Sequence, residues 1–466
     1  MVFDVADLSP AERRKHGKSA RTHAPLEGQA QVGAAADRDA VGLLLGQADS
    51  RVPELVPIRH GRMLASPFTF FRGAALPMAA DLAMTPDSGL RVQLCGDAHL
   101  SNFGIFASPD RHLVFDLNDF DETLPGPFEW DVKRFAASLA VAGRDLGLSA
   151  KDRHSLVRAG VATYRTSMAE FASKSLLEVW YSRLDVEEAL EKVAPQVGAE
   201  GVGRTRKALA KARKRDSLQV LGKLTTVEGG HRRIISQPPL VVPIEELLDD
   251  VGADQLYRFL DEILEDYRRT LTADRRHLLN QFRVVGAARK VVGVGSVGTR
   301  AWIVLLEADG GKLPLFLQIK EAQRSVLADY CGDGIHDHEG ERVVSGQHLM
   351  QAASDIFLGW QRITGVDGVV RDFYVRQLRD WKFSLPLESM TLAGLTTYAQ
   401  LCGWTLARAH ARTGDRFAIA GYLGKSDRFD RALADFAEQY ADITEQDHAA
   451  LAAAVEEGRA QAIHDV

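Results

Sequence analysis

The sequence predicts an α+β chain of two lobes, with a mainly helical lobe first and a β-rich lobe second. Amphipathic patterns with helical spacing dominate residues 150–275. Three β-rich runs follow from about residue 281, and helical patterns then return. The predicted segments are a peripheral arm (1–40), a helical lobe (41–275), a β-rich lobe (276–385) and C-terminal helices that pack on the first lobe (386–466).

The first lobe has clear local patterns. Residues 1–40 mix Arg, Lys, Ala and Gly with little periodicity, which is typical of a mobile or peripheral arm. Apolar positions on one face predict a helix from about Phe70 to Met84. FGIFA and HLVFDL are strand-like, with the turn sequence SPDR between them. Further helices are predicted from about residue 129, along RHSLVRAGVATYRTSMAEFASKSLLEVWYSRL and along LYRFLDEILEDYRRTL.

The second lobe begins with FRVVGAARKVVGVGSVG, TRAWIVLLEA and LPLFLQIKEA, which are β-rich. Residues 338–354 are predicted to be helical, and residues 372–378 to form another strand. A helix over 398–412 and an Ala-rich, acidic helical tail complete the chain.

Composition narrows the class of protein. The chain has 466 residues, 45% hydrophobic and 26% charged, so it is long enough for two lobes. A net charge of −6 gives no overall basic field, so we expect no nucleic-acid partner. Three cysteines are too few for a disulfide framework. No apolar run approaches the ~18 residues of a membrane helix, and the N-terminus has no apolar signal core. We therefore expect a cytoplasmic protein without a membrane partner.

Residues 95–121, CGDAHLSNFGIFASPDRHLVFDLNDFD, carry the strongest chemical pattern. Asp97 is followed five positions later by Asn102, and the predicted hairpin then carries Asp116 and Asp119. Phosphoryl transfer uses one carboxylate to orient the acceptor hydroxyl, and an amide and a second carboxylate to hold Mg²⁺. Asp97 suits the first role, and Asn102 with Asp116 or Asp119 suits the second. The alternative is that these acids only cap turns and helices.

A second segment supplies phosphate-binding residue types. GVGSVG contains Gly293, Gly295, Ser296 and Gly298, and it lies between two predicted strands. A dinucleotide-binding turn would be followed by a helix, so the pattern favours a glycine-rich hairpin that covers phosphates. Glycines in a hairpin can also be turn residues alone.

Lys320 interrupts the apolar strand LFLQIKEA, where an unpaired charge is costly. A lysine on a third strand that holds phosphates and pairs with a helix glutamate would explain it. Glu339 and Glu341, at the start of the next predicted helix, are the candidate partners. The alternative is that Lys320 extends to solvent.

These motifs resemble those of the protein-kinase-like superfamily, especially the aminoglycoside phosphotransferases and choline kinases. GDAHLSN is similar to their catalytic loop, with Asp97, His99 and Asn102 at matching places. The resemblance implies that VFDLNDFD is the metal-binding strand, that Asp131 in EWDVKRFAAS supports the catalytic loop, and that FYVRQL lies beside the adenine. It implies a helical catalytic lobe and a β-rich nucleotide-binding lobe with ATP and Mg²⁺ as the cofactors. LVPIRHGRM, SPFTFFRG and VVGVGSVGTR also resemble a bacterial family called domain of unknown function 2252.

The chain departs from the kinase-like pattern in three ways. The catalytic loop precedes the nucleotide lobe, which implies a circular permutation. Cys95 occupies a position that is usually His in those kinases, which concerns the packing beneath the loop. Asp116 has a spacing from Asn102 closer to the kinase pattern than Asp119 has, so we favour Asp116 as the metal ligand, while Asp119–Phe120 keeps Asp119 open.

The class of acceptor molecule is predicted from the absence of a long segment that could bind a peptide. The short segment between Asp116 and Asp131 leaves little room for a peptide platform, so we expect a small-molecule acceptor. Arg59, Arg62 and Arg72 could hold an anionic substrate, or could pair with local acids. The basic run RTRKALAKARKR (204–215) allows the same two interpretations. The cluster His336, Asp337, His338 and Glu339 is more typical of a loop and helix start than of a metal site.

The leading hypothesis is an ATP- and Mg²⁺-dependent phosphotransferase in which Asp97 and Lys320 are catalytic. AMP transfer by the same fold, a nucleotide-binding regulator without turnover, and a metal-dependent phosphohydrolase remain alternatives. The phosphohydrolase would use Asp97, His99, Asp116, Asp119 and Asp121 and would not need Lys320. The sequence leaves the acceptor, ATP against GTP, the pathway and the oligomeric state open.

Overall fold

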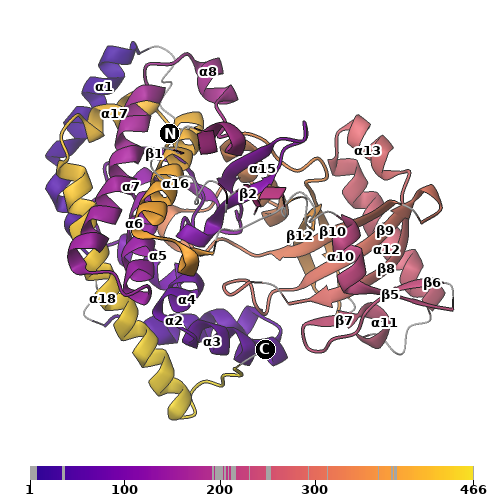
Figure 1. Cartoon of the computed structure of the whole chain (residues 1–466). Coiled ribbons are helices and arrows are strands. Elements are labelled where there is room, and N and C mark those ends of the chain that lie inside the picture. Colours follow the sequence, from indigo (N-terminus) through magenta and orange to yellow (C-terminus); the bar gives the residue numbers. More distant parts are fainter. Residues whose placement is uncertain are drawn as a thin grey trace.

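The chain has an α+β fold, as predicted, with a helical region beside a sheet region (Figure 1). The computed structural model describes residues 8–464 except 34–36, 230, 248–252, 292, 312, 366, 379–380, 382–385 and most of 192–216. The basic run at 204–215 lies largely outside the described residues. In the described part of the chain, no helix is both long enough and apolar enough to cross a membrane.

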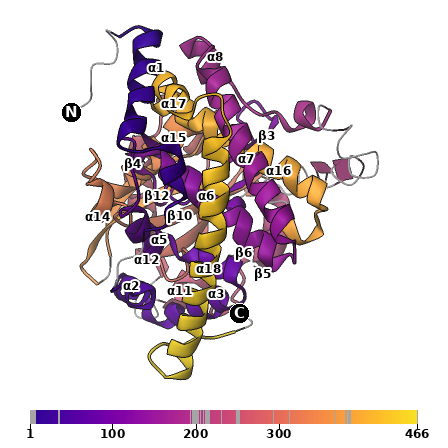
Figure 2. The same cartoon turned by 90° about the vertical axis from the view of Figure 1, so that its left-hand side faces the viewer.

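Four long helices build the helical region: α6 (Phe128–Asp145), α7 (Ala150–Phe171), α16 (Leu392–Thr413) and α18 (Arg428–Glu456). Helix α16 packs on α7, and α18 packs on both α6 and α7. The C-terminal helices and the helices that follow residues 95–121 therefore share one core. Figure 2 shows α18 along the outside of this region.

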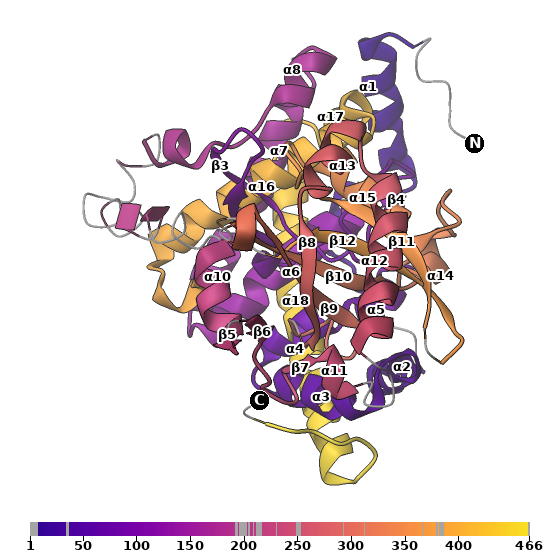
Figure 3. The same cartoon turned by 90° about the vertical axis from the view of Figure 1, so that its right-hand side faces the viewer.

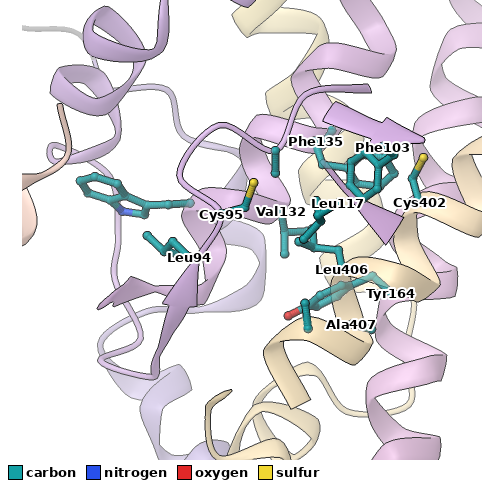
Figure 4. Packing of buried hydrophobic residues seen from close by; sticks show 14 of the residues in the cluster. Leu94, Cys95, Phe103, Leu117, Val132, Phe135, Tyr164, Cys402, Leu406 and Ala407 are labelled. Atoms are coloured by element: carbon teal, nitrogen blue, oxygen red, sulfur yellow. The ribbon is translucent and has the colours of Figure 1, made fainter. Parts of the chain in front are cut away.

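The hairpin of residues 95–121, which we call the acidic segment, is anchored in the same core. Strands β2 (Phe103–Ala107) and β3 (Leu113–Leu117) pair in antiparallel fashion, as predicted, with Gly104 opposite Asp116. Phe103 and Leu117 lie beside Phe135 of α6 and Leu406 of α16 (Figure 4). The Phe103 and Phe135 rings are 5.9 Å apart between centroids. A second pair, β1 (Arg91–Leu94) with β4 (Leu124–Pro127), holds the two ends of the segment together.

The N-terminal segment is peripheral but packed. Helix α1 (Pro10–Ser19) begins with a capping box between Ser9 and Glu12 and lies against α17 (Arg416–Leu423). A Cβ at Gly17 would lie 1.8 Å from the carbonyl oxygen of Ala418, so only glycine allows this approach. The arm expected to be mobile or peripheral thus contains a helix that is docked on α17.

Two of the predicted helices are interrupted. The helix expected from Phe70 to Met84 is α4 (Pro67–Gly73) followed by α5 (Ala75–Leu82), with Ala74 outside helical geometry. The Gly73 carbonyl accepts a hydrogen bond from Arg59 (2.9 Å) and not from a helical N–H. The long stretch that begins at RHSLVRAG is also divided, into α7 and α8 (Leu176–Tyr181), because Ser175 caps a new helix.

The sheet region contains one antiparallel sheet with strand order β11-β12-β10-β9-β8-β7. The predicted runs form β8 (Arg283–Lys290), β9 (Ala301–Ala308), β10 (Leu313–Ala322) and β12 (Val370–Gln377). The edge strands β7 (Val241–Pro243) and β11 (Gly359–Thr364) complete it, and β11 was not predicted because its fully buried positions are Gly359 and Gln361, which give no apolar alternation. Lys320 of β10 lies opposite Ala301 on one side and Tyr374 on the other.

Both faces of the sheet are covered (Figure 3). Val304 and Leu306 of β9 face the core formed with α12 (Ala253–Thr270), whereas Ile303 and Leu305 face the core formed with α10 (Ser217–Leu224). Helix α15 (Glu339–Met350) contacts both β12 of the sheet and α16 of the helical region. The remaining elements are α2 (Ala40–Gln47), α3 (Val56–Leu64), β5 (Thr225–Glu228), β6 (His231–Ile234), α11 (Ile244–Leu247), α13 (Ala273–Leu279) and α14 (Ala328–Cys331).

Candidate functional site

The acidic segment, residues 95–121, begins as a tight loop held by Asp131. The carboxylate of Asp131, on α6, accepts hydrogen bonds from the backbone N–H groups of Cys95 (2.7 Å) and Gly96 (3.0 Å). It also lies 3.1 Å from Nε2 of His410 on α16. Gly96 has a φ of +85°, and a Cβ there would lie 2.3 Å from the carbonyl oxygen of Glu122. Asp131 therefore has the supporting position that the kinase-like resemblance implies.

Asp97 follows this loop with its carboxylate oriented by an arginine. Arg134, one turn along α6 from Asp131, donates to Oδ1 of Asp97 from Nε (2.8 Å) and stacks on the ring of Phe71 (3.8 Å to the centroid). The side chain of Asp97 remains 22% exposed. His99 is buried beside it, and burial lowers the pKa of His99 to about 4. Asp97 is thus a fixed carboxylate with one open side.

Asn102 links the two acidic parts of the segment. Its Nδ2 donates to the carbonyl oxygens of Asp97 (2.9 Å) and Asp119 (3.0 Å), and it lies 3.3 Å from Sγ of Cys95. These donors fix the amide so that Oδ1 is its free end. Oδ1 is buried and has no hydrogen-bond partner among the described residues. A buried, oriented carbonyl oxygen without a donor suits a cation ligand.

Asp116 and Asp119 lie in opposite environments. Asp116 is 2% exposed and binds Arg408 of α16 (2.5 Å), with further hydrogen bonds from the N–H groups of Leu117 (2.9 Å) and Ala352 (3.0 Å). It does not line the cavity described below, whereas Asp119, 43% exposed, does. The geometry therefore does not support the preference for Asp116 as metal ligand, and it favours Asp119.

Lys320 joins this segment to the sheet. Its side chain is 2% exposed, and its ammonium binds Asp121 and lies 3.9 Å from Oδ2 of Asp119. Asp121 also accepts hydrogen bonds from the hydroxyl groups of Tyr374 (2.8 Å) and Ser296 (3.2 Å). These acids keep the pKa of Lys320 above its ordinary value in spite of burial. The sequence argument was that a charge within an apolar strand is costly unless it is paired. The buried Lys320 is paired with an acid from a distant segment, which agrees with that argument.

The glutamates expected to pair with Lys320 lie elsewhere. Glu339 binds Arg342 one turn along α15, and Glu341 lies 3.8 Å from Nδ1 of His336. Arg342 in turn donates to the backbone carbonyls of Asp121 (2.9 Å) and Thr123 (2.7 Å). The predicted pairing with Glu339 or Glu341 is therefore wrong for this conformation. Helix α15 instead contacts the end of the acidic segment through the hydrogen bonds of Arg342.

The glycine-rich loop between β8 and β9 folds towards the helical region. Gly293 and Gly298 have φ values of +68° and +91°, which favour glycine. The carbonyl of Gly293 accepts from Arg62 (2.7 Å), and that of Val297 accepts from Arg51 (2.5 Å). These two hydrogen bonds hold the glycine-rich loop against residues 51–62, which precede the acidic segment.

One cavity of about 470 Å³ collects most of these residues. The cavity is lined by the glycine-rich loop and by four residues of the acidic segment: Asp97, Asn102, Asp119 and Asp121. Its volume lies within the range of ligand pockets. Further lining residues that the sequence motifs did not identify as a site are Gln47, Ser50, Arg51, Ser101, Asn118, Glu122, Glu321 and Gln323.

A magnesium ion fits the chemistry of two of these groups. Oδ1 of Asn102 and the carboxylate of Asp119 are oxygen donors on one segment, and both residues line the cavity. Mg²⁺ is commonly held by one or two protein oxygens together with substrate phosphates. Within the described residues, no group of three or more His, Cys, Asp or Glu side chains could hold a metal ion. A metal held by these two groups would need further ligands from a bound molecule or from water.

Comparison with known proteins identifies the family. Residues 51–454 match the bacterial family described as "uncharacterized protein conserved in bacteria (DUF2252)". The chain belongs to this family. Neither the curated proteins nor the solved structures include a significant match. The match covers residues 95–121, the glycine-rich loop and Lys320, and all the lining residues of the cavity except Gln47 and Ser50 lie within the matched range.

Proposed function

We propose that this DUF2252 protein is an ATP- and Mg²⁺-dependent phosphotransferase of kinase-like, circularly permuted fold that acts on a small molecule. One observation carries the proposal: Asp97, Asn102 and Asp119 line the same cavity as Gly293, Gly295 and Ser296, nearly 200 residues away in the chain. A catalytic carboxylate, metal-type oxygen donors and a glycine-rich loop are the parts that phosphoryl transfer requires.

The order of elements around Lys320 supports the nucleotide-binding role. A glycine-rich loop connects β8 to β9, the third strand β10 carries Lys320, and helix α15 follows. Protein kinases use a glycine-rich loop, a third-strand lysine and a following helix in the same succession. In this chain the catalytic loop precedes these elements, which is why the proposal includes a permutation.

Each residue of the site would have its own role in the reaction. The carboxylate of Asp97, held by Arg134, would accept the hydrogen bond of the acceptor hydroxyl and receive its proton as the oxygen attacks phosphorus. Asn102 and Asp119 would hold Mg²⁺, which neutralises phosphate charge when bound. Lys320 and the glycine-rich loop would position the phosphates at the edge where Asp121 meets Ser296.

The test measures nucleotide binding and transfer separately. ATP with Mg²⁺ should raise the melting temperature of the wild type, since ligand at 100 times its Kd stabilises by about 2.7 kcal/mol. Lys320→Met and Asp119→Asn should lose this shift. Asp97→Asn should keep it but transfer γ-phosphate label at least ~10²-fold more slowly. Asp442→Asn, an exposed carboxylate on α18, is the matched control.

Three results would contradict the proposal. The first is no Mg²⁺-dependent shift with any nucleotide. The second is full transfer activity in Asp97→Asn. The third is phosphate release without an acceptor that does not depend on Lys320, which would favour the phosphohydrolase. Label transferred from the α-phosphate in place of the γ-phosphate would instead identify AMP transfer.

A further inference from the structure

One wall of the cavity is formed by three arginines that precede the catalytic loop. Arg51 lies before α3, Arg59 lies on α3 and Arg72 lies on α4. All three line the cavity. Arg59 is 1% exposed and Arg51 is 6% exposed, so these guanidinium groups are not ordinary surface charges.

None of the three forms an ion pair with a carboxylate of the described residues. Arg51 donates to the carbonyl of Val297, and Arg59 donates to Oε1 of Gln47 (2.8 Å) and to the carbonyl of Gly73 (2.9 Å). Within the same part of the chain, Nε of each arginine and Nη1 of Arg59 are buried without a hydrogen-bond partner. Burial lowers the pKa of all three, that of Arg51 to about 10.

Several buried arginines elsewhere in the protein are paired with acids. Arg408 binds Asp116 (2.5 Å), Arg165 binds Asp430 (2.7 Å), and Arg38 bridges Asp81 and Asp447 (2.6 Å each). A buried guanidinium without a counter-charge is unfavourable unless something else supplies the charge. On this wall, by contrast, two buried arginines and the half-buried Arg72 lie together without a direct ion pair to a carboxylate of the described residues.

The arginine wall also adjoins the glycine-rich loop. A Cβ at Gly298 would lie 3.0 Å from the side chain of Arg51, and one at Gly295 would lie 3.1 Å from the carbonyl oxygen of Arg72. Only small residues allow the loop to approach this closely. Fork-shaped guanidinium groups bind phosphate oxygens by paired hydrogen bonds, and a glycine-rich loop lets phosphate come close to the backbone.

We propose that Arg51, Arg59 and Arg72, together with the glycine-rich loop, form a binding site for a phosphate group. The inference rests on the proposed function for the use of this site, but the site itself depends only on the arginines. The phosphate could be part of the nucleotide, or it could be a phosphate carried by the acceptor molecule.

The experiment titrates inorganic phosphate and pyrophosphate into the full-length protein by calorimetry. Wild type should bind, and Arg72→Gln and Arg51→Gln should each bind at least about tenfold more weakly, since each loses a charged hydrogen-bond donor. Arg59→Gln is a third variant, interpreted only if its melting temperature is preserved, because Arg59 also holds Gln47 and Gly73. Arg158→Gln, a partly exposed arginine of α7, is the control and should bind like wild type.

A second titration, with saturating ATP and Mg²⁺, separates the two sources of phosphate. Competition would assign the arginines to the nucleotide, and simultaneous binding would assign them to a phosphorylated acceptor. Absence of phosphate and pyrophosphate binding, or equal binding by wild type, Arg72→Gln and Arg51→Gln, would overturn the site. Arginine-dependent phosphate binding without any nucleotide binding would instead contradict the proposed function while leaving the site in place.

Discussion

The two walls of the cavity carry opposite charges. The basic wall consists of Arg51, Arg59 and Arg72, and the acidic wall of Asp97, Asp119, Asp121 and Glu122. Asp97 is paired with Arg134 and Asp121 with Lys320, whereas the arginines of the basic wall form no ion pair with an acid of the described residues. Burial lowers the pKa of Arg51 to about 10 and raises that of Glu122 to about 7, so these two groups are disfavoured in their charged forms. Shifts of this kind are typical of functional sites.

The comparison shows what kind of ligand would relieve both walls. An anion alone would pair with the arginines but would be repelled by the carboxylates. A cation alone would do the reverse. A metal-bound phosphate carries both charges, with its phosphate oxygens suited to guanidinium groups and its metal suited to Asn102 and Asp119. The separation of charge is therefore an independent argument for the proposed ligand class.

The largest expected effect comes from an acid that lies behind the acidic wall. Asp116→Asn leaves the Arg408 guanidinium buried without its counter-charge, and breaking a buried ion pair typically costs about 3–5 kcal/mol. We expect the free energy of unfolding in urea to fall by that amount. Asp119→Asn, in the partly exposed wall, should change it by only about 0.5 kcal/mol or less.

This pair of variants separates a structural acid from a ligand-binding one. Loss of Mg²⁺-dependent nucleotide binding in Asp119→Asn, with stability preserved, would support the assignment of Asp119. Comparable destabilisation by both substitutions would show that the two acids are equivalent and would remove the distinction between the wall and the core behind it.

Local sequence patterns predicted the parts of the site that depend on nearby residues. The hairpin from Phe103 to Leu117 consists of two short strand-like runs joined by a turn sequence, and the helix that begins at Phe128 repeats apolar positions with helical spacing. Each element can therefore be predicted from a short stretch of sequence. The helix break at Ala74 also has a local signal that the expected helix overlooked, because Pro77 has no N–H to donate to the Gly73 carbonyl four residues before it. That carbonyl accepts from Arg59 of a separate helix instead.

Partners far apart in the sequence were the main source of error. Asp116 and Asp119 are three residues apart, and only Arg408, nearly 300 residues later, makes one of them structural. Lys320 was expected to pair with a glutamate of the following helix, but Asp121 binds it across 199 residues. The lysine's place in an apolar strand predicted that it must be paired, but sequence spacing does not say with what.

A smaller effect is expected from the pH dependence of Glu122. Its pKa is raised from 4.5 to about 7, chiefly by burial, so the folded state binds the proton more tightly than the unfolded state. Its contribution to stability is therefore fully present below about pH 4.5 and is lost as pH rises through about 7. Wild type should lose on the order of 1–2 kcal/mol relative to Glu122→Gln over this range, since the side chain keeps partial access to the cavity.

Urea unfolding at pH 5 and pH 8 would measure this difference. Glu457→Gln, at the exposed end of α18, would show the effect of removing a surface carboxylate. A constant difference between wild type and Glu122→Gln at both pH values would mean that Glu122 is not protonated in the folded protein. The acidic wall would then be better solvated than its burial indicates.

The smallest effect on stability is expected at the basic wall. Arg72→Gln removes a guanidinium that has no carboxylate partner among the described residues and whose Nε is buried without a hydrogen bond, so no ion pair is lost. The free energy of unfolding should change by about 0.5 kcal/mol or less, or increase slightly, because a neutral amide is easier to bury than a charge. Urea unfolding without ligand is the measurement. A loss of more than about 2 kcal/mol would show that Arg72 supports the fold. Unchanged stability together with weaker phosphate binding would show that the charge is kept there for a ligand and not for the fold, as many active-site charges are.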